Sequence, residues 1–306
     1  MGNIVALPCV FWYNLCTKSL RAVFLQGCNV KLLVVDGHNL LFQMFFGMPS
    51  RIVNSQGVAI HGVLGFVGAL NKILDAVCPT HAVVLFDGER HNPRRDLDEN
   101  YKANRIDYSQ VEESQNPFSQ LPHVYAALDF MQIAHAETET CETDDVVASY
   151  VKNYRDVCEI VISSFDSDYF QLIDDNVSVL RYRGKNSVLC TKNFVQQHYG
   201  VQPCEFAHFK SLVGDLSDNV VGVKGIGPKR AAAILQRFGT VQNLCEHAEQ
   251  VENAALRQAV CQSKQQILRN FALINLQGNE PLPFEMCQLL LKTRKKTMDV
   301  VRGIGL

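Results

Sequence analysis

The sequence predicts an α/β fold in which helices flank a mostly parallel sheet, followed by a helical second half. Short apolar runs at 32–35, 82–86 and 160–162 alternate with segments of helical spacing, as buried parallel strands do. After about residue 192 the strand pattern stops. A length of 306 residues suits one large domain or two modest ones, and 47% hydrophobic residues provide a core.

The helices are predicted from the spacing of their apolar residues, which recur every three or four positions. In the first half they are expected at 62–77, near 121–131 and at 142–154. In the second half they are expected at 192–199, 205–213, 228–238 and over much of 253–275.

Residues 1–30 are apolar and aromatic and stand apart from this pattern. Their first cation is Lys18, whereas a secretory signal begins with positive charge. We expect a dispensable extension, of the kind that a start site assigned too early would add; a membrane-touching or partner-binding segment is the alternative. No run of 18 apolar residues predicts a membrane span.

Composition limits the classes of function. Lys and Arg number 29 against 31 Asp and Glu, so the net charge is -2 and a globally basic nucleic-acid coat is excluded. Binding to nucleic acid would need local basic patches. The eleven cysteines are odd in number and form no CxxC, which indicates free thiols and a cytoplasmic protein rather than disulfides or a zinc site.

Three aspartates directly follow the three predicted strands: Asp36, Asp87 and Asp166. In an open α/β sheet the carboxyl ends of the strands border the ligand crevice. A single aspartate there can instead cap a helix or form a turn, but three of three favours a site. Asp168 is close enough in sequence to reach the same crevice.

Two further acidic motifs follow. Glu142, Asp144 and Asp145 begin a helix, where they could simply complement the helix dipole, and Asp215 and Asp218 repeat the spacing of three. Nine carboxylates in one crevice would repel one another unless divalent cations separated them. Oxygen ligands alone select Mg²⁺ or Mn²⁺, and two such ions would support hydrolysis of a phosphodiester.

A glycine-rich segment at 222–230 predicts a hairpin between helices, with backbone N–H groups open to a phosphate. Residues 219–245 contain four cations and no acid, which makes a local basic patch in a chain of net charge -2. A plain turn between core helices is the alternative.

Together these motifs resemble the 5′-3′ exonuclease and flap endonuclease family, and in particular the nuclease domain of bacterial DNA polymerase I in its free-standing form, since the length leaves no room for a polymerase module. The similarity extends from about residue 31 to 276. It rests on VVDGHNLLFQMFF, LFDGERHNPRRDLDENYKANR, CETDDVVASY, SSFDSDYFQLI and GDLSDNVVGVKGIGPKRAAAIL, in that order.

The resemblance implies a PIN-like nuclease core at 31–191 with a helical arch near 88–125. It also implies a helical DNA-binding subdomain at 192–306 with a helix–three-turn–helix (helix-hairpin-helix) motif at 215–238. The implied activity is Mg²⁺-dependent hydrolysis of DNA near 5′ ends, flaps or nicks, with RNA–DNA hybrids as a possible further substrate.

By the same resemblance, each functional residue receives an expected role. One metal site would use Asp36, Asp87, Glu142 and Asp144, with Asp145 beside them, and a second would use Asp166, Asp168, Asp215 and Asp218. Arg94 and Lys102 would steady the scissile phosphate and act in catalysis. DNA would be held by Arg105, Gly222, Lys224, Gly225, Gly227, Lys229 and Arg230, and K⁺ could bind the carbonyls of the hairpin.

Two departures from the family pattern concern the 5′ strand. Gln43 stands where the family usually has an arginine, and residues 106–151 contain no Lys or Arg, although the family's arch normally carries some. Two other hypotheses stay open: a non-catalytic DNA-binding protein that uses the hairpin alone, and a PIN-like ribonuclease. The intact set of acids opposes the first, and residues 210–238 oppose the second.

Overall fold

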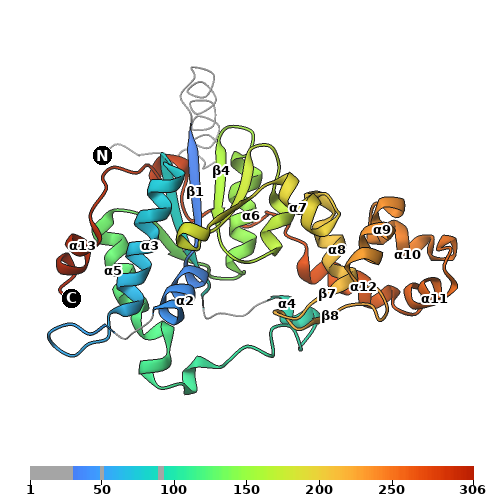
Figure 1. Cartoon of the computed structure of the whole chain (residues 1–306), viewed down its shortest axis with the longest axis horizontal. Helices are drawn as coiled ribbons and strands as arrows, with labels where there is room; N and C mark the ends of the chain where they lie inside the picture. Colours follow the sequence, from blue (N-terminus) through green and yellow to red (C-terminus); the bar gives the residue numbers. More distant parts are fainter. Residues whose placement is uncertain (1–29, 49–51, 89–92) are drawn as a thin grey trace, which may run out of the picture.

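The computed structural model describes residues 30–48, 52–88 and 93–306. Its centre is a six-stranded sheet in the order β3-β2-β1-β4-β5-β6, in which only the edge strand β6 is antiparallel (Figure 1). The strands are β1 (Lys31–Asp36), β2 (His81–Phe86), β3 (Ala134–Glu137), β4 (Glu159–Ser163), β5 (Val177–Arg181) and β6 (Val188–Cys190). The predicted α/β class with a mostly parallel sheet is confirmed.

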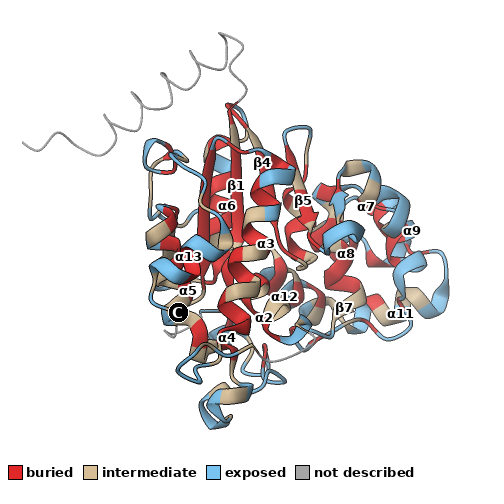
Figure 2. Cartoon of the chain, turned by 60° about the vertical axis from the view of Figure 1, so that its left-hand side comes forward, coloured by how far each residue is buried: buried red, intermediate tan, exposed pale blue. Residues whose placement is uncertain are grey.

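The central strand β1 shows why the sheet needs helices on both faces. Leu32, Leu33, Val34 and Val35 are all buried. Leu33 and Val35 join the core beneath α2 (Gly37–Gly47), α3 (His61–Val77) and α5 (Leu121–Met131). Leu32 and Val34 point to the opposite face, toward α6 (Thr143–Tyr154) and the helical half. The continuous apolar run therefore marks a strand buried on both sides, as Figure 2 shows for β1 and β4.

The second half extends to one side of the sheet in Figure 1. It consists of α7 (Lys192–Tyr199), α8 (Phe206–Val213), α9 (Pro228–Phe238), α10 (Val241–Glu246), α11 (Ala254–Gln262) and α12 (Lys264–Ile274). Between α8 and α9 the chain forms a short antiparallel pair, β7 (Gly214–Asp215) with β8 (Val220–Val221). The helices predicted at 192–199, 205–213 and 228–238 match α7, α8 and α9 closely.

Some elements escaped the prediction. β5 and β6 are short strands near the sheet edge, and α2 begins directly at the end of β1, where its run of aromatic residues has no clear helical period. The predicted helical stretch 253–275 is divided at Ser263 into α11 and α12.

The C-terminal segment returns to the first half of the chain. Leu290 forms a β-bridge with His81 beside β2, and α13 (Thr297–Gly303) packs against α3 and α5. The division into parts 31–191 and 192–306 stays a prediction.

The segment between α4 (Pro93–Leu97) and α5 crosses below the sheet in Figure 1. This is the region of the expected arch. Its middle consists of turns and three short 3₁₀ helices: η1 (Tyr108–Gln110), η2 (Glu113–Gln115) and η3 (Pro117–Gln120). Polar side chains and Pro117 explain why no regular helix forms there.

The predicted N-terminal extension lies outside the described residues, apart from Val30. Within the described ranges, no helix has the length and apolar character that crossing a membrane requires.

Candidate active site

The carboxyl ends of three neighbouring strands each bring an aspartate to the same edge of the sheet. Asp36 ends β1, Asp87 follows β2, and Asp166 lies three residues after β4. Because β1 pairs in parallel with both β2 and β4, these ends lie side by side. The structure therefore brings together the aspartates that follow the apolar runs of the sequence.

Asp36 is fixed by hydrogen bonds to both of its carboxylate oxygens. The N–H of Asn39 donates to Oδ1 at 3.0 Å, which caps α2, and the hydroxyl of Ser164 donates to Oδ2 at 3.0 Å. Burial, together with the charges of Asp87 and Asp166, raises the pKa of Asp36 to about 6. A nearby divalent cation would favour the ionised form of this carboxylate.

The acidic start of α6 adjoins these strand ends. The N–H of Thr143 donates to Oδ1 of Asp87 at 2.7 Å and so fixes the beginning of the helix beside β2. Asp144 accepts a hydrogen bond from the buried hydroxyl of Tyr169. Burial, with the charge of Asp166, raises the pKa of Asp144 well above its usual range. Asp144 is thus part of the same electrostatic group as the strand-end aspartates.

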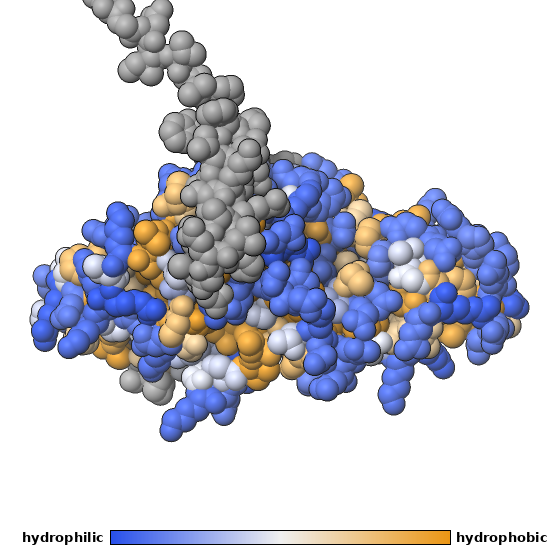
Figure 3. Space-filling model, turned by 90° about the horizontal axis from the view of Figure 1, so that it is seen from above, coloured by the Kyte–Doolittle hydropathy of each residue, from blue (hydrophilic) through white to orange (hydrophobic). Residues whose placement is uncertain are grey.

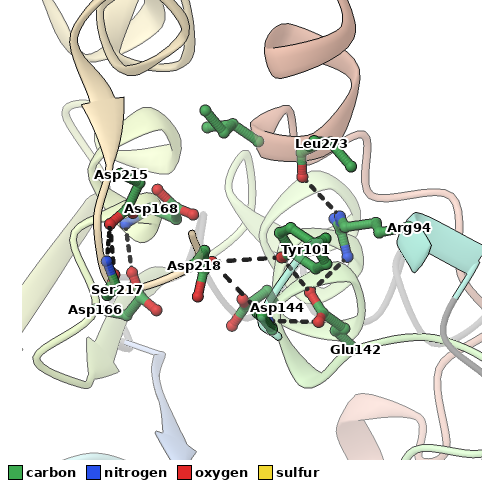
Figure 4. A network of polar contacts seen from close by, with 12 residues as sticks. Arg94, Tyr101, Glu142, Asp144, Asp166, Asp168, Asp215, Ser217, Asp218 and Leu273 are labelled. Carbon is green, nitrogen blue, oxygen red and sulfur yellow. Dashed lines mark hydrogen bonds and ion pairs between the residues drawn. The ribbon is translucent and has the colours of Figure 1, made fainter. Parts of the chain in front are cut away.

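Arg94 links two of the acids of α6 to the helical half. Its guanidinium donates to Oε2 of Glu142 at 2.8 Å and to both oxygens of Asp145 at 2.6 and 2.7 Å. Its Nε donates to the carbonyl of Leu273 at 2.8 Å, as Figure 4 shows. Arg94 therefore neutralises Asp145 and joins α4 to α6 and α12.

Lys102 places a second buried charge among the acids. Its ammonium contacts Oε1 of Glu142 and lies 4.0 Å from Oδ2 of Asp218. These carboxylates outweigh burial and raise the pKa of Lys102, so it stays charged. Arg105 donates to Oδ1 of Asp218 at 2.9 Å from a half-exposed position. The two cations enter the cluster from the segment that follows α4.

A second group of acids lies beside the first. Asp168, Asp215 and Asp218 each offer a carboxylate oxygen within 4.8 Å of the others, an arrangement that can hold a metal ion. Asp218 lies between Asp215 and Asp144 in Figure 4. Asp166 accepts a hydrogen bond from the N–H of Asp168 at 2.8 Å, which connects this group to the end of β4.

Lys210 is a residue of this site that we did not predict from the sequence. It is 5% exposed, and its ammonium contacts carboxylate oxygens of both Asp168 and Asp215. Those charges outweigh burial and raise its pKa, and Lys210 in turn lowers the pKa of Asp215. A signal was present: a lysine five residues before Asp215, on a helix that also carries the apolar residues Phe206, Phe209 and Leu212.

The glycine turn has the backbone geometry that its composition implies. A Cβ at Gly222 would lie 2.1 Å from the carbonyl oxygen of Val213, and Gly225 has φ +86. The buried side chains of Val223 and Ile226 anchor the turn to the core. Gly227 directly precedes α9, which begins at Pro228.

The cations of this turn face outward. Lys224, Lys229 and Arg230 are exposed, and Arg230 donates to the carbonyl of Gly225 at 2.7 Å. Seen from above, the end of the molecule that carries α9, α10 and α11 is mostly hydrophilic (Figure 3). The turn and the beginning of α9 therefore form an exposed cationic surface.

Comparison with known protein families identifies the family that has this combination of sheet, acids and glycine turn. The profile described as the 5′-3′ exonuclease N-terminal, resolvase-like domain matches residues 31–200, and that of the 5′-3′ exonuclease C-terminal SAM fold matches residues 201–297. The chain belongs to the 5′-3′ exonuclease family. The resemblance that the motifs indicated is confirmed.

Curated relatives of this family member include DNA polymerases. DNA polymerase I of Bacillus subtilis (strain 168) is 31% identical over 280 residues, which cover 90% of this chain and 31% of that protein. The thermostable DNA polymerase I of Thermus thermophilus is 30% identical over 259 residues, which cover 84% and 30%. The chain thus spans about a third of the length of these relatives.

Solved structures share the fold of this 5′-3′ exonuclease family member. The bacteriophage T5 flap endonuclease, in a pseudo-enzyme-product complex with DNA and metal ions, has a TM-score of 0.67 at 24% identity, covering 80% of this chain and 88% of that one. The Rad2 catalytic core in complex with DNA substrate has a TM-score of 0.55 at 15% identity, covering 96% and 92%. At these identities the likeness shows the fold alone.

Proposed function

We propose that the protein is a Mg²⁺-dependent 5′-3′ deoxyribonuclease that hydrolyses DNA near 5′ ends, flaps and nicks, with a cytoplasmic location. The observation that carries the proposal is the meeting of nine carboxylates at one edge of the sheet. These acids come from the ends of three strands, from the beginning of α6, from the 3₁₀ helix η4 (Asp168–Leu172) and from the β7–β8 pair. The T5 and Rad2 structures contain DNA, which supports the choice of substrate.

The donor set fits hard divalent cations, because every donor in the two groups is a carboxylate oxygen. Asp36, Asp87, Glu142 and Asp144, with Asp145 nearby, would hold one ion, and Asp166, Asp168, Asp215 and Asp218 a second. Bound Mg²⁺ or Mn²⁺ would lower the pKa of a water and stabilise negative charge on the phosphate.

The cations of the chain would act on the substrate itself. Lys102 and Arg94 carry positive charge beside Glu142, at the junction of the two acidic groups. A phosphate oxygen that enters this junction would meet the Lys102 ammonium, which can stabilise charge that develops during hydrolysis. Arg94 would mainly position Glu142 and Asp145, since its guanidinium already binds both.

The exposed cationic surface formed by the glycine turn and the beginning of α9 would hold the DNA duplex. Lys224, Lys229 and Arg230 are exposed near the start of α9, where backbone N–H groups and cations favour phosphate contacts. Gly222, Gly225 and Gly227 would let the backbone approach the DNA, and K⁺ could bind carbonyls of the same turn. Arg105 would contact the strand beside the acidic groups.

The first test is digestion of 5′-end-labelled nicked, flapped and blunt duplexes, with Mg²⁺ or with EDTA. We expect release of short 5′ products only with Mg²⁺, and none from Asp36→Asn. The matched control is Asp156→Asn, which removes an exposed acid before β4 at the opposite end of the sheet. Binding without cleavage would indicate a non-catalytic DNA-binding protein, and preferential cleavage of single-stranded RNA would indicate a ribonuclease.

The second test concerns the glycine turn. Replacement of Lys224, Lys229 and Arg230 by alanine should weaken binding to all duplexes alike and lower the salt dependence of binding by up to about three units, one for each phosphate contact. If the salt dependence of DNA binding were unchanged, residues 222–230 would form only a structural turn.

A further inference from the structure

A pocket of about 850 Å³ lies on the side of the sheet that α2, α3 and the C-terminal segment cover. In Figure 1 this side carries α2, α3 and α13, and the helices α9, α10 and α11 lie at the opposite end of the molecule. The lining residues belong neither to the acidic groups nor to the glycine turn. The proposed nuclease function therefore leaves this pocket without a role.

The floor of the pocket is apolar, and it is hollow because α3 carries small residues there. Gly65, Gly68 and Ala69 share one face of α3, since residues three and four apart are neighbours on a helix surface. The opposite face of α3 carries the residues that fill the core. Met44 and Met48, at the end of α2, form the adjoining wall. Methionine side chains adapt to apolar groups of many shapes, so this floor suits a large apolar side chain.

The rim of the pocket is positively charged. Within the described ranges, its charged lining residues are four cations and one acid: Lys72, Arg294, Lys295, Lys296 and Asp75. Arg294 donates to Oδ1 of Asp75 at 3.0 Å, which neutralises the acid. Lys72 and Lys296 are exposed, and no ion pair of the described residues involves either of them. Two cations of the rim are thus free to meet a negatively charged partner.

Hydrogen bonds hold the C-terminal part of the rim against α3. The side-chain amide of Asn71 donates at 3.1 Å to the carbonyl of Lys295 and at 3.1 Å to the hydroxyl of Thr297. Arg294 donates to the carbonyl of Leu74 at 2.8 Å. The floor and the rim are therefore in place before a partner binds, which lowers the entropic cost of binding.

An apolar floor inside a cationic rim selects the chemistry of the partner. DNA would be attracted by the cations, but phosphates gain nothing from the apolar floor, and Tyr182, the aromatic residue of the lining, is only 9% exposed and offers little surface for stacking. Residues 1–29 are apolar but contain cations and no acids, so the rim would repel them. An acidic peptide with one or two large apolar side chains matches both features, because its carboxylates would face Lys72 and Lys296.

We propose that this pocket binds a short acidic segment of a partner protein, whose large apolar side chains lie on the floor between α2 and α3 and whose carboxylates pair with Lys72 and Lys296. The inference does not depend on the proposed nuclease function and adds a site at which another protein recruits this chain. A partner held there leaves the acidic groups and the exposed cationic surface free for DNA. Because ion pairs contribute to binding, its affinity falls as the salt concentration rises.

The test measures the binding of fluorescent peptides to the full chain by anisotropy. The probe is a peptide of about ten residues in which Asp and Glu surround a Leu-Phe pair. One control peptide replaces Leu-Phe by two alanines, and a second replaces every acid by its amide. On the protein side, Gly68→Leu fills the floor, where an added Cβ would have Thr297 as its neighbour at 4.0 Å, and Lys72→Glu/Lys296→Glu reverses the charge of the rim. Lys185→Glu, at an exposed lysine of the β5–β6 connection, is the matched control.

We expect the wild type to bind the acidic Leu-Phe peptide at least about tenfold more tightly than either control peptide. Gly68→Leu and the double charge reversal should each weaken this binding about tenfold, because the first blocks the apolar contacts and the second replaces attraction by repulsion. Lys185→Glu should bind the peptide as the wild type does. All variants should keep the circular dichroism spectrum of the wild type.

The proposal would be overturned if the wild type bound none of the three peptides or bound all three equally, and this comparison decides the matter even if a variant fails to fold. Peptide binding that Gly68→Leu leaves unchanged would also overturn it. Binding of a single-stranded oligonucleotide that Gly68→Leu abolishes would assign the pocket to DNA instead, and a dimer that Gly68→Leu dissociates, seen by sedimentation, would assign it to a second copy of the chain. Failure of the nuclease proposal looks different, because it would abolish cleavage and leave peptide binding unchanged.

Discussion

The two groups of acids at the sheet edge differ in how their negative charge is balanced. In the first group, Lys102 and Arg94 pair with Glu142 and Asp145, but Asp36 and Asp144 accept hydrogen bonds from neutral donors, and no ion pair reaches either of these two aspartates from the described part of the chain. In the second group, the Lys210 ammonium lies against Asp168 and Asp215. Asp36 and Asp144 thus lack the ion pair that Asp168 and Asp215 have with Lys210.

The difference bears on metal binding. A cation that binds beside Asp36 and Asp144 meets carboxylates that have no ion-pair partner, so it need not displace an ammonium from them. A cation that binds between Asp168 and Asp215 must compete with the Lys210 ammonium. We therefore expect the first group to bind a divalent ion more tightly than the second.

The largest expected effect comes from removing one acid of each group. Asp144→Asn should lower the single-turnover rate on a nicked duplex about a thousandfold, because a metal supplies several kcal/mol of stabilisation and 1.36 kcal/mol is a factor of ten. Asp168→Asn should lower it less, and raising the Mn²⁺ concentration should restore part of the rate. Single-turnover rates of both variants, measured over a Mn²⁺ titration, check this prediction. If both variants lost the same factor in rate and neither recovered with Mn²⁺, the two acidic groups would not differ in metal binding.

The variant Lys210→Met tests the comparison of the two acidic groups through the free energy of unfolding. Without metal, the variant leaves Asp168 and Asp215 with no cation between them, and breaking a buried ion pair typically costs about 3–5 kcal/mol of unfolding free energy. Mn²⁺ should restore much of this loss and should stabilise the variant more than the wild type. Urea unfolding in EDTA and in Mn²⁺ measures both effects.

The control for that experiment is Lys185→Met, which removes an exposed lysine from the β5–β6 connection. It should unfold like the wild type in both buffers. If Mn²⁺ stabilised Lys210→Met and the wild type to the same extent, Lys210 would not compete with a metal.

The smallest expected effect is a pH dependence set by Asp36. Its pKa is raised from 3.8 to about 6, so the folded protein holds this proton more tightly than the unfolded chain. Its contribution is therefore most favourable at low pH and is lost as pH rises from about 4 to about 6. In EDTA, Asp36→Asn should gain stability relative to the wild type over that interval, by at most about 3 kcal/mol. Urea unfolding of both proteins at pH 4.5 and 7.5 checks the sign of this change. If the difference in unfolding free energy between Asp36→Asn and the wild type were the same at both pH values, Asp36 would not be the group that sets the pH dependence.

The sequence predicts the first acidic group better than the second. Asp36 and Asp87 follow strands that are buried on both faces, and parallel pairing alone brings such strand ends together. The position of Lys210 depends on how α8 packs beside the sheet, and no periodicity encodes that packing. The same holds for the hydroxyl of Tyr169, which reaches Asp144 from a short 3₁₀ helix.

The contact between the rings of Phe42 and Phe118, whose centroids lie 5.2 Å apart, could not be predicted for a related reason. Phe42 and Phe118 are far apart in sequence, and the segment that carries Phe118 has no regular secondary structure longer than a few residues.

The return of α13 to the first half of the chain has a consequence for synthesis. Val300 and Val301 are buried against the helices that cover one face of the sheet, and Leu290 pairs with His81 beside β2. A ribosome releases the N-terminal half first, yet that half keeps part of its apolar face uncovered until residues 297–303 emerge. This face is therefore completed only after residues 297–303 have left the ribosome, and until then part of the apolar surface of α3 and α5 stays uncovered.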